Sequence, residues 1–339
     1  MKSRSEDYLY RIRQFFLVHD SATTAEISKH LTISFPTATK LLENMEKQGE
    51  VSLGGLDESN GGRRAKRYRY NPHFKQGLSV YVEKDELGFI VFNSFGEVLE
   101  EGMVADSLGK GNVTPLLQLV SGLLDRFPRI SAVSLGVPVS VNGQGDILYA
   151  PHYEDLHGLN LKALIEEKFG TPTTVENDMN AAVLGYSYND SYVEPSSSTF
   201  IYLYFGHNGP GAGLLVNGEL VRGKSHFTGE ISFVPQVHGK SFGQSLSQEQ
   251  ISPGSLQGHG ADAVGQLIAA FTAIINPHSV IFSDQEIDGS DITTILQRSR
   301  TFIPESHLPE LVISNWSKDY LRGLQRLCIE LLLDQTSLT

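Results

Sequence analysis

The sequence predicts an α/β protein in two parts, a small unit over residues 1–75 and a longer region over residues 76–339. In the first part, apolar residues recur at three- and four-residue steps, which is typical of short amphipathic helices. In the second, strand patterns alternate with helix patterns, as in α/β domains. The charge also changes sign. Residues 1–75 carry 13 Lys and Arg against 9 Asp and Glu, a net of +4, whereas the other 264 carry 14 against 30, a net of −16.

The composition excludes several classes of protein. With 40% hydrophobic and 19% charged residues, the 339-residue chain can bury a large core, which argues against a disordered or fibrous protein. Its single cysteine, Cys328, cannot form an intrachain disulfide or a thiolate zinc site. No apolar signal core follows the first residues, and no apolar run approaches the roughly 18 residues that cross a bilayer. We therefore expect a cytoplasmic, globular protein.

Three helices are expected in the first part. The first covers residues 7–18 and faces inward through an apolar stripe that includes Ile12 and Phe16. The second is capped by Thr23 or Thr24 and runs to residue 31, with Glu26 at the capping-box position and Ala25, Ile27 and Leu31 expected to be buried. The third runs over residues 35–48, because Ser34 is a good N-cap and Gly49 a good stop.

A basic hairpin follows these helices. Residues 50–53 and 67–70 alternate as strands do, and glycine-rich segments separate them. Three helices and such a hairpin predict a winged helix-turn-helix, in which the amino-terminal end of the third helix enters a major groove and the hairpin contacts phosphates. A small helical bundle with a solvated basic strand is the alternative. The candidate DNA-binding residues are Ser34, Thr37, Thr39, Lys40, Arg63, Arg64 and Lys66.

The longer region reads as α/β units. Strands are expected over residues 78–83, 88–94, 130–137, 173–175, 199–205 and 279–283, and helices over 116–127, 161–169 and 261–275. A terminal helix follows, and its apolar stripe comprises Leu321, Leu324, Leu327, Cys328 and Leu331. Cys328 is therefore expected in the core.

Three segments of this region carry a family resemblance. They are VENDMNAA at 175–182, GPGAG at 209–213 leading to VNGEL at 216–220, and TGEI at 228–231. With the GGRR wing at 61–64, they resemble the ROK family (repressors, open reading frames and sugar kinases), and most closely its xylose- and N-acetylglucosamine-type repressors. The resemblance implies a winged helix-turn-helix over 1–75 and a sugar-sensing domain over 76–339. That domain would have the two-lobed actin-like ATPase fold, with a sugar cleft between the lobes and the C-terminal helix packed back on the first lobe.

The resemblance also implies a sugar site. Its candidate residues are His152, Glu176, Asn177, Asp178 and Glu230. Carboxylates and amides suit a ligand with several hydroxyls, because each can hydrogen-bond a group that both donates and accepts. In the family's kinases, the aspartate that matches Asp178 is the general base. Acidic residues at a helix amino terminus are the structural alternative, because they stabilise the helix dipole.

Departures from the kinase pattern argue against phosphoryl transfer. Tyr81, Glu83, Lys84 and Asp85 stand where the family's kinases have the Asp, the two Gly and the Thr of a D-x-G-G-T phosphate loop, so acidic side chains would meet the ATP phosphates. The second loop, residues 206–209, lacks its threonine, and Ser283-Asp284 replaces a glycine cluster. We expect no enzymatic activity and no cofactor.

The family's sugar-contacting histidine and zinc cysteines are also missing. Phe233 stands in place of the histidine, and His152 and Tyr153 are candidates to supply the lost ring contacts. We expect no metal, because the other histidines lack metal-ligand spacing. Surface or satisfied loop positions are predicted for His207, His226, His238 and His259.

The resulting hypothesis is a homodimeric or tetrameric transcriptional regulator. It would bind operator DNA, repress carbohydrate-utilisation genes and take a sugar or sugar phosphate in the interlobe cleft. The same motifs would serve an activator. Two alternatives stay open: a sugar kinase that uses Asp178 as general base, and a regulator whose degenerate cleft binds no sugar.

Overall fold

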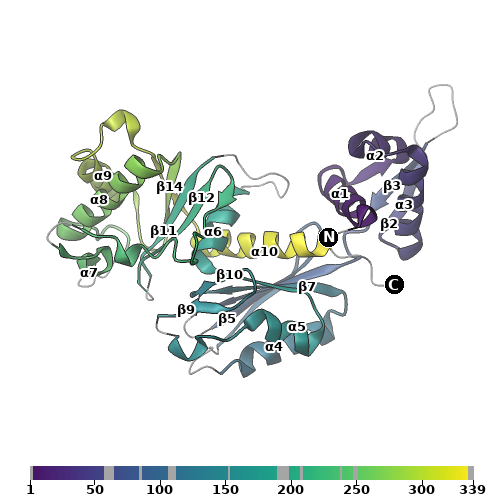
Figure 1. The fold of residues 1–339 in the computed structure, drawn as a ribbon, viewed down its shortest axis with the longest axis horizontal. Coiled ribbons are helices and arrows are strands. Elements are labelled where there is room, and N and C mark those ends of the chain that lie inside the picture. The colour runs from purple at the N-terminus through teal and green to yellow at the C-terminus, as the bar shows by residue number, and fades with distance from the viewer. Residues whose placement is uncertain are drawn as a thin grey trace.

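The computed structural model describes residues 3–56, 65–83, 86–105, 112–151, 153–188, 198–206, 209–236, 239–246 and 251–334. Figure 1 shows a small N-terminal unit, two lobes that each contain a β-sheet, and one long helix, α10 (Trp316–Asp334), between the lobes. Within the described ranges, no helix has the length and apolar character needed to cross a membrane.

The N-terminal unit contains α1 (Arg4–His19), α2 (Thr24–Leu31) and α3 (Phe35–Gln48). Its antiparallel sheet has the order β1 (Ser21–Thr23), β3 (Lys66–Tyr70) and β2 (Val51–Leu56). The predicted caps are confirmed: Thr23 and Glu26 form a capping box on α2, Ser34 accepts from Thr37 N, and Gly49 ends α3 in the left-handed region at φ 79°.

Two details of this unit differ from the prediction. Strand β1 was not expected, because three residues are too few to show an alternating pattern. Ala25 is exposed rather than buried; Ala22, which β1 directs inward, is fully buried instead. The apolar residues that share the core include Ile12, Phe16, Ile27, Leu42 and Met45.

The two lobes repeat one sheet topology. In the first, β4 (Gln76–Val82) pairs antiparallel with β5 (Leu87–Asn93) and parallel with β7 (Ile130–Val137). The outer strands are β6 (Val98–Val104), antiparallel to β5, and β10 (Thr173–Asn177), parallel to β7. The second lobe has the same pattern, with the order β13 (Glu219–Leu220), β12 (Gly211–Val216), β11 (Phe200–Tyr204), β14 (Ser279–Ser283) and β15 (Glu310–Ser314).

Helices cover these sheets on their outer faces. The first lobe has α4 (Thr114–Arg126) and α5 (Leu161–Phe169), and the second has α7 (Phe242–Leu246), α8 (Gly258–Ile274) and α9 (Gly289–Ser299). A short pair, β8 (Ser140–Val141) and β9 (Ile147–Tyr149), projects from the first lobe. Helix α9 and strand β15 are further elements that the sequence reading did not identify.

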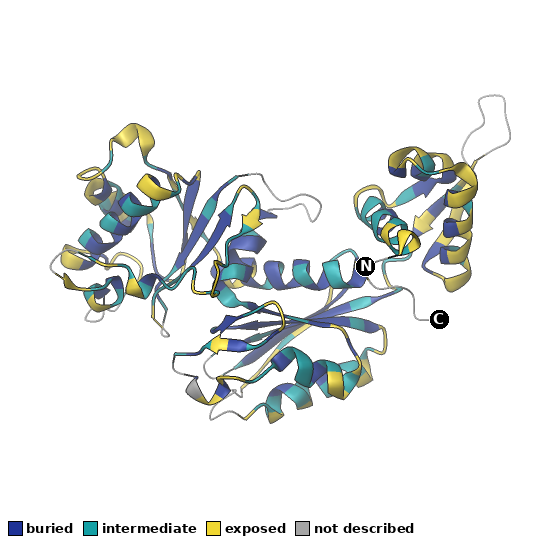
Figure 2. Cartoon of the chain, viewed as in Figure 1, coloured by how far each residue is buried: buried dark blue, intermediate teal, exposed yellow. Residues whose placement is uncertain are grey.

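Helices α6 (Asp178–Ser187) and α10 lie between the sheets, where most of their residues are buried (Figure 2). Their backbones touch at two glycines. A Cβ added to Gly323 would lie 1.8 Å from the Ala181 carbonyl oxygen, and one added to Gly185 would lie 1.9 Å from the Asp319 carbonyl oxygen. This close crossing fixes the position of α6. Cys328 is fully buried on α10, as expected.

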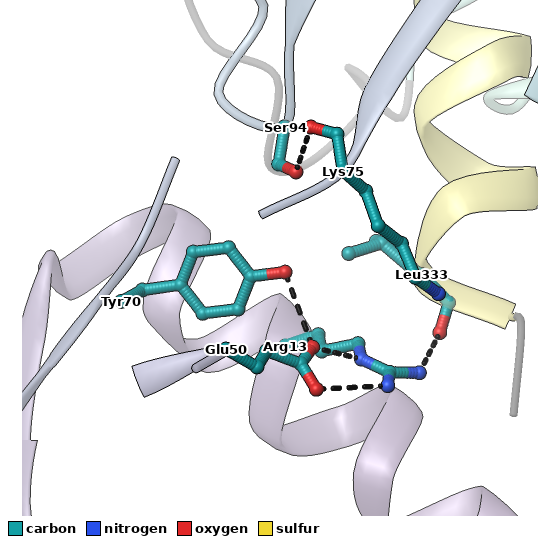
Figure 3. Close-up of polar contacts among 6 residues, drawn as sticks. All are labelled: Arg13, Glu50, Tyr70, Lys75, Ser94 and Leu333. Carbon is teal, nitrogen blue, oxygen red and sulfur yellow. Dashed lines mark hydrogen bonds and ion pairs between the residues drawn. The ribbon is translucent and has the colours of Figure 1, made fainter. Parts of the chain in front are cut away.

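The C-terminal end of α10 also contacts the N-terminal unit. Arg13 on α1 is 2% exposed and donates to Glu50, which is fully buried, over 2.5 and 3.1 Å. Its third nitrogen donates to the Leu333 carbonyl at 3.0 Å (Figure 3). Arg13 thus supplies a hydrogen bond to one of the last carbonyls of α10, which have no partner within the helix. Tyr70 Oη donates to the same Glu50 at 3.2 Å.

Candidate functional site

A cavity of about 960 Å³ lies between the two lobes. Its walls come from the β7–β8 connection, β9, the start of α6, the loops after β11 and β14, and the segment between β13 and α7. The size falls within the range of small-molecule sites. Three of the predicted sugar-binding residues, Asn177, Asp178 and Glu230, line it together, although 52 positions separate the last two in the sequence.

Asn177 and Asp178 are held by the first turn of α6. Asn177 caps the helix, because its Oδ1 accepts from Met179 N at 3.0 Å and Asn180 N at 3.1 Å. Its Nδ2 donates to Asp178 Oδ1 at 2.8 Å, and Met179 N donates to the same oxygen at 2.8 Å. Burial and the Glu230 carboxylate raise the pKa of Asp178 to about 7, although the Met179 N–H opposes both.

Glu230 and Glu176 occupy different positions. Glu230 lines the cavity just before the 3₁₀ turn at Ile231–Phe233, and burial raises the pKa of its carboxyl. Glu176 is 5% exposed and is not among the lining residues. Its carboxylate accepts from Asn180 Nδ2 at 2.9 Å and pairs with Arg222, both of which do line the cavity. Glu176 thus holds Asn180 and Arg222 in the cavity wall without lining the cavity itself.

The aromatic rings in the cavity wall do not include Tyr153. His152 lies outside the described residues. Tyr153 is buried in the core of the first lobe and does not line the cavity. Tyr149 and Phe233 line it instead, with ring centroids 6.3 Å apart.

Two further carboxyl groups, those of Glu83 and Glu286, line the cavity. Glu83 lines the cavity, and burial, together with the charge of Asp178, raises its pKa to about 7. Glu286, after β14, accepts from Phe205 N over 2.9 and 3.1 Å, and burial raises its pKa to about 7. Sequence reasoning missed Glu286 because 81 positions separate it from Phe205. Lys84 and Asp85 lie outside the described residues.

His226 differs from the prediction in part. It is half-buried in a loop, but it lines the cavity and its buried Nδ1 has no hydrogen-bond partner among the described residues. Its backbone is in the left-handed region at φ 56° and is anchored by Ser140, whose Oγ donates to the His226 carbonyl at 2.5 Å. His259 is exposed on α8 as expected, whereas His207 and His238 lie outside the described residues. Within the described ranges, no group of three metal-ligating side chains occurs.

The candidate DNA-binding residues on α3 lie at its exposed amino-terminal end. Ser34 and Thr37 hydroxyls bond each other at 2.7 Å, and Thr39 Oγ1 donates back to the Phe35 carbonyl at 2.9 Å. Lys40 is exposed, as is Lys66 on β3. Arg63 and Arg64 lie outside the described residues.

Comparison with known proteins places this geometry in a family. Residues 78–243 match the model described as the ROK family. The xylose repressor of Caldicellulosiruptor bescii is 27% identical over 215 residues, which cover 61% of this chain and 53% of that protein. The N-acetylglucosamine repressor of Escherichia coli is 21% identical over 216 residues, which cover 62% of this chain and 52% of that protein. The chain thus spans about half the length of the curated relatives it matches.

Solved structures share the fold. The structure described as a ROK family transcriptional regulator, homologous to the Escherichia coli MLC protein, has a TM-score of 0.67 at 18% identity and covers 92% of this chain and 94% of its own. The ROK hexokinase from Thermus thermophilus has a TM-score of 0.57 at 17% identity and covers 74% of this chain and 97% of its own. The match to the regulator therefore extends over more of this chain than the match to the hexokinase.

Proposed function

Because residues 78–243 are a ROK family domain, we propose that the chain is a DNA-binding transcriptional regulator whose affinity for an operator changes when a sugar binds between the lobes. Its role would be to repress carbohydrate-utilisation genes. Two relatives are named a xylose repressor and an N-acetylglucosamine repressor, which supports this role. The observation that carries this proposal is a cavity that brings Asn177, Asp178 and Glu230 together and also has the carboxyl groups of Glu83 and Glu286 in its wall.

Those carboxylates disfavour catalysis. A kinase must bring a triphosphate against open backbone N–H groups. Here the Phe205 N–H is already bonded by Glu286, and Glu83 adds a second carboxylate beside Asp178. The raised pKa of Asp178 is the one observation that suits a general base. We therefore propose sugar binding without phosphoryl transfer. Steady ATP consumption with a sugar, abolished by Asp178→Asn, would instead support a kinase.

The N-terminal unit supplies the DNA contact in this proposal. Phe35, Thr37 and Lys40 lie exposed around the first turns of α3, the part of a recognition helix that reaches base edges. The overall charge of −12 would repel DNA at long range, so contact depends on local cations. A homodimer would place two such helices on a roughly palindromic operator, with half-sites spaced by about 10 base pairs or a multiple of that distance.

Sugar binding must favour one arrangement of the chain to act as a signal. A ligand with equal affinity for the DNA-competent and DNA-incompetent arrangements would change nothing. Helix α10 joins the two regions physically, since Trp316 and Tyr320 lie at its end near Glu83, and Leu333, at its other end, accepts from Arg13. A lobe movement that shifts α10 would therefore reach α1.

The test is selection of operators from random duplex DNA, followed by binding measurements with Lys40→Ala and the matched variant Lys47→Ala. Lys47 is exposed at the opposite end of α3. We expect Lys40→Ala to weaken binding about tenfold and, if Lys40 contacts phosphate, to reduce the salt slope by about one. Lys47→Ala should leave affinity nearly unchanged. Failure of wild-type protein to select any sequence would refute the proposal.

A further inference from the structure

Three aromatic rings meet at the cavity, and two of them are exposed. Tyr149 comes from β9 of the first lobe, and Phe227 and Phe233 come from the second lobe. The ring centroids lie 5.3 Å apart for Phe227 and Phe233, 6.0 Å for Tyr149 and Phe227, and 6.3 Å for Tyr149 and Phe233. Phe233 is 55% exposed and Phe227 is 44% exposed.

This cluster is not part of a folded core. The buried core of the second lobe contains neither Phe227 nor Phe233, and the core of the first lobe does not contain Tyr149. Tyr149 and Phe233 line the cavity directly, while Phe227 packs against both. Aromatic rings bury more area than other side chains at a small cost in rotamer freedom, so exposed rings in a cavity wall suit contact with a ligand.

A polar group lies beside these rings. His226 precedes Phe227 and lines the cavity, and its Nδ1 is buried without a partner among the described residues. The Nδ1 atom is buried, so it is not itself open to a ligand in the cavity. The left-handed backbone of His226, at φ 56°, adds strain at the same position. His226 therefore shares the cavity wall with the rings.

The charge of the cavity limits what that ligand can be. The lining includes the carboxyl groups of Glu83, Asp178, Glu230 and Glu286. Among the described lining residues, Arg222 is the one with a permanent positive charge, and Glu176 already pairs with it. A phosphate would meet net negative charge in a partly desolvated site, whereas hydroxyl groups can donate to the same carboxylates.

We infer that Tyr149, Phe227 and Phe233 form a platform on which the apolar face of an uncharged pyranose stacks. This rests on the proposed function and narrows its effector from a sugar or sugar phosphate to a neutral sugar. Rings from both lobes take part, so a sugar on the platform also bridges the lobes. The hydroxyls on its other side face the carboxyl groups of Asp178 and Glu230.

Calorimetric titration of the full chain tests the platform. The probes are D-xylose, D-glucose and N-acetyl-D-glucosamine, together with the 6-phosphates of the two hexoses. We expect at least one neutral sugar to bind and each 6-phosphate to bind at least tenfold more weakly than its parent sugar. Phe233→Ala should weaken the neutral sugar about tenfold, and Phe233→Tyr, which keeps the ring, should restore most of the affinity.

The matched control is Phe302→Ala. Phe302 is 53% exposed and does not line the cavity, so its loss removes an equally exposed ring without touching the site. Its sugar affinity should stay within twofold of wild type. Equal sugar affinities for Phe233→Ala and Phe302→Ala, or 6-phosphates that bind as tightly as their parents, would overturn the inference.

Operator binding separates this inference from the proposed function. If a neutral sugar binds and changes operator affinity equally in wild type and Phe233→Ala, the platform inference is wrong, but the proposed regulatory function is supported. If Phe233→Ala weakens the sugar but wild-type protein selects no operator, the platform stands and the regulator is wrong. If no neutral sugar in the panel binds wild-type protein, both the platform inference and the proposed response to a sugar are refuted.

Discussion

Replacement of Glu50 by alanine should weaken the N-terminal unit and its attachment to α10. The change removes the anion that holds the Arg13 guanidinium, which is 2% exposed and also donates to the Leu333 carbonyl. Arginine cannot release its proton, so the variant keeps a buried charge that has lost its doubly bonded carboxylate, and Asp334 compensates it only in part. Tyr70 Oη loses its acceptor as well.

The magnitude follows from the geometry of the pair. Removal of one partner from a buried ion pair costs about 3–5 kcal/mol, which corresponds to a change of about 10²- to 10⁴-fold in the opening equilibrium. Lys75 increases the effect. Burial and the charge of Arg13 lower the pKa of Lys75 to about 8, while Glu50 opposes both. Without Glu50, two cations share the site, and only Lys75 can relieve the repulsion by losing its proton.

Hydrogen exchange read by mass spectrometry measures this effect segment by segment, which matters because several parts of the chain can open independently. Amides of α1 and of the last turns of α10 should exchange faster by the same factor. The double variant Arg13→Met/Glu50→Leu removes both charges, so it should cost only about 2 kcal/mol for the lost hydrogen bonds.

A surface ion pair provides the control. Arg300 and Glu305 lie 2.5 Å apart but are 46% and 71% exposed, so Glu305→Ala should cost less than about 1 kcal/mol. The reasoning is refuted if Glu50→Ala costs no more than Glu305→Ala. It is equally refuted if the double variant is as unstable as Glu50→Ala, because the uncompensated charge would then not be the cause.

The helices of the N-terminal unit were predictable because their signals are local. Ser34 caps α3 through the amide three residues later, Thr23 and Glu26 cap α2 over the same spacing, and Gly49 ends α3. The Arg13–Glu50 pair was not predictable, since 37 positions separate the two residues and neither has a neighbour in sequence that reveals its burial.

The candidate site divides in the same way. Asn177 and Asp178 are found from one contiguous motif, and the structure brings Glu230 to them. Glu286 and the aromatic platform were missed because the fold assembles them from distant segments. Tyr149 and Phe227, for example, belong to different lobes and lie 78 positions apart. His226 was misread because only the structure shows that its Nδ1 is buried in a cavity wall.

Two further perturbations test how α6 presents Asp178 to the cavity. Gly323→Ala places a Cβ 1.8 Å from the Ala181 carbonyl oxygen, so the helices must separate, and we expect a loss of about 1–3 kcal/mol with weaker sugar binding. Gly122→Ala, in an exposed helical position with no atom within 4 Å, should instead stabilise by up to about 1 kcal/mol. The second test is pH. Burial raises the pKa of Asp178 from 3.8 to about 7. The folded chain therefore binds the additional proton, and stability falls as pH rises from about 4 to about 7. Asp178→Asn, which resembles the protonated acid, should therefore raise the melting temperature more at pH 8 than at pH 5. Sugar hydroxyls that donate to Asp178 favour its charged form, so affinity should rise from pH 6 to pH 8, with proton release detected by calorimetry in buffers of different ionisation enthalpy. An affinity that is flat over this range in wild-type protein would mean that the sugar does not contact the ionised carboxylate.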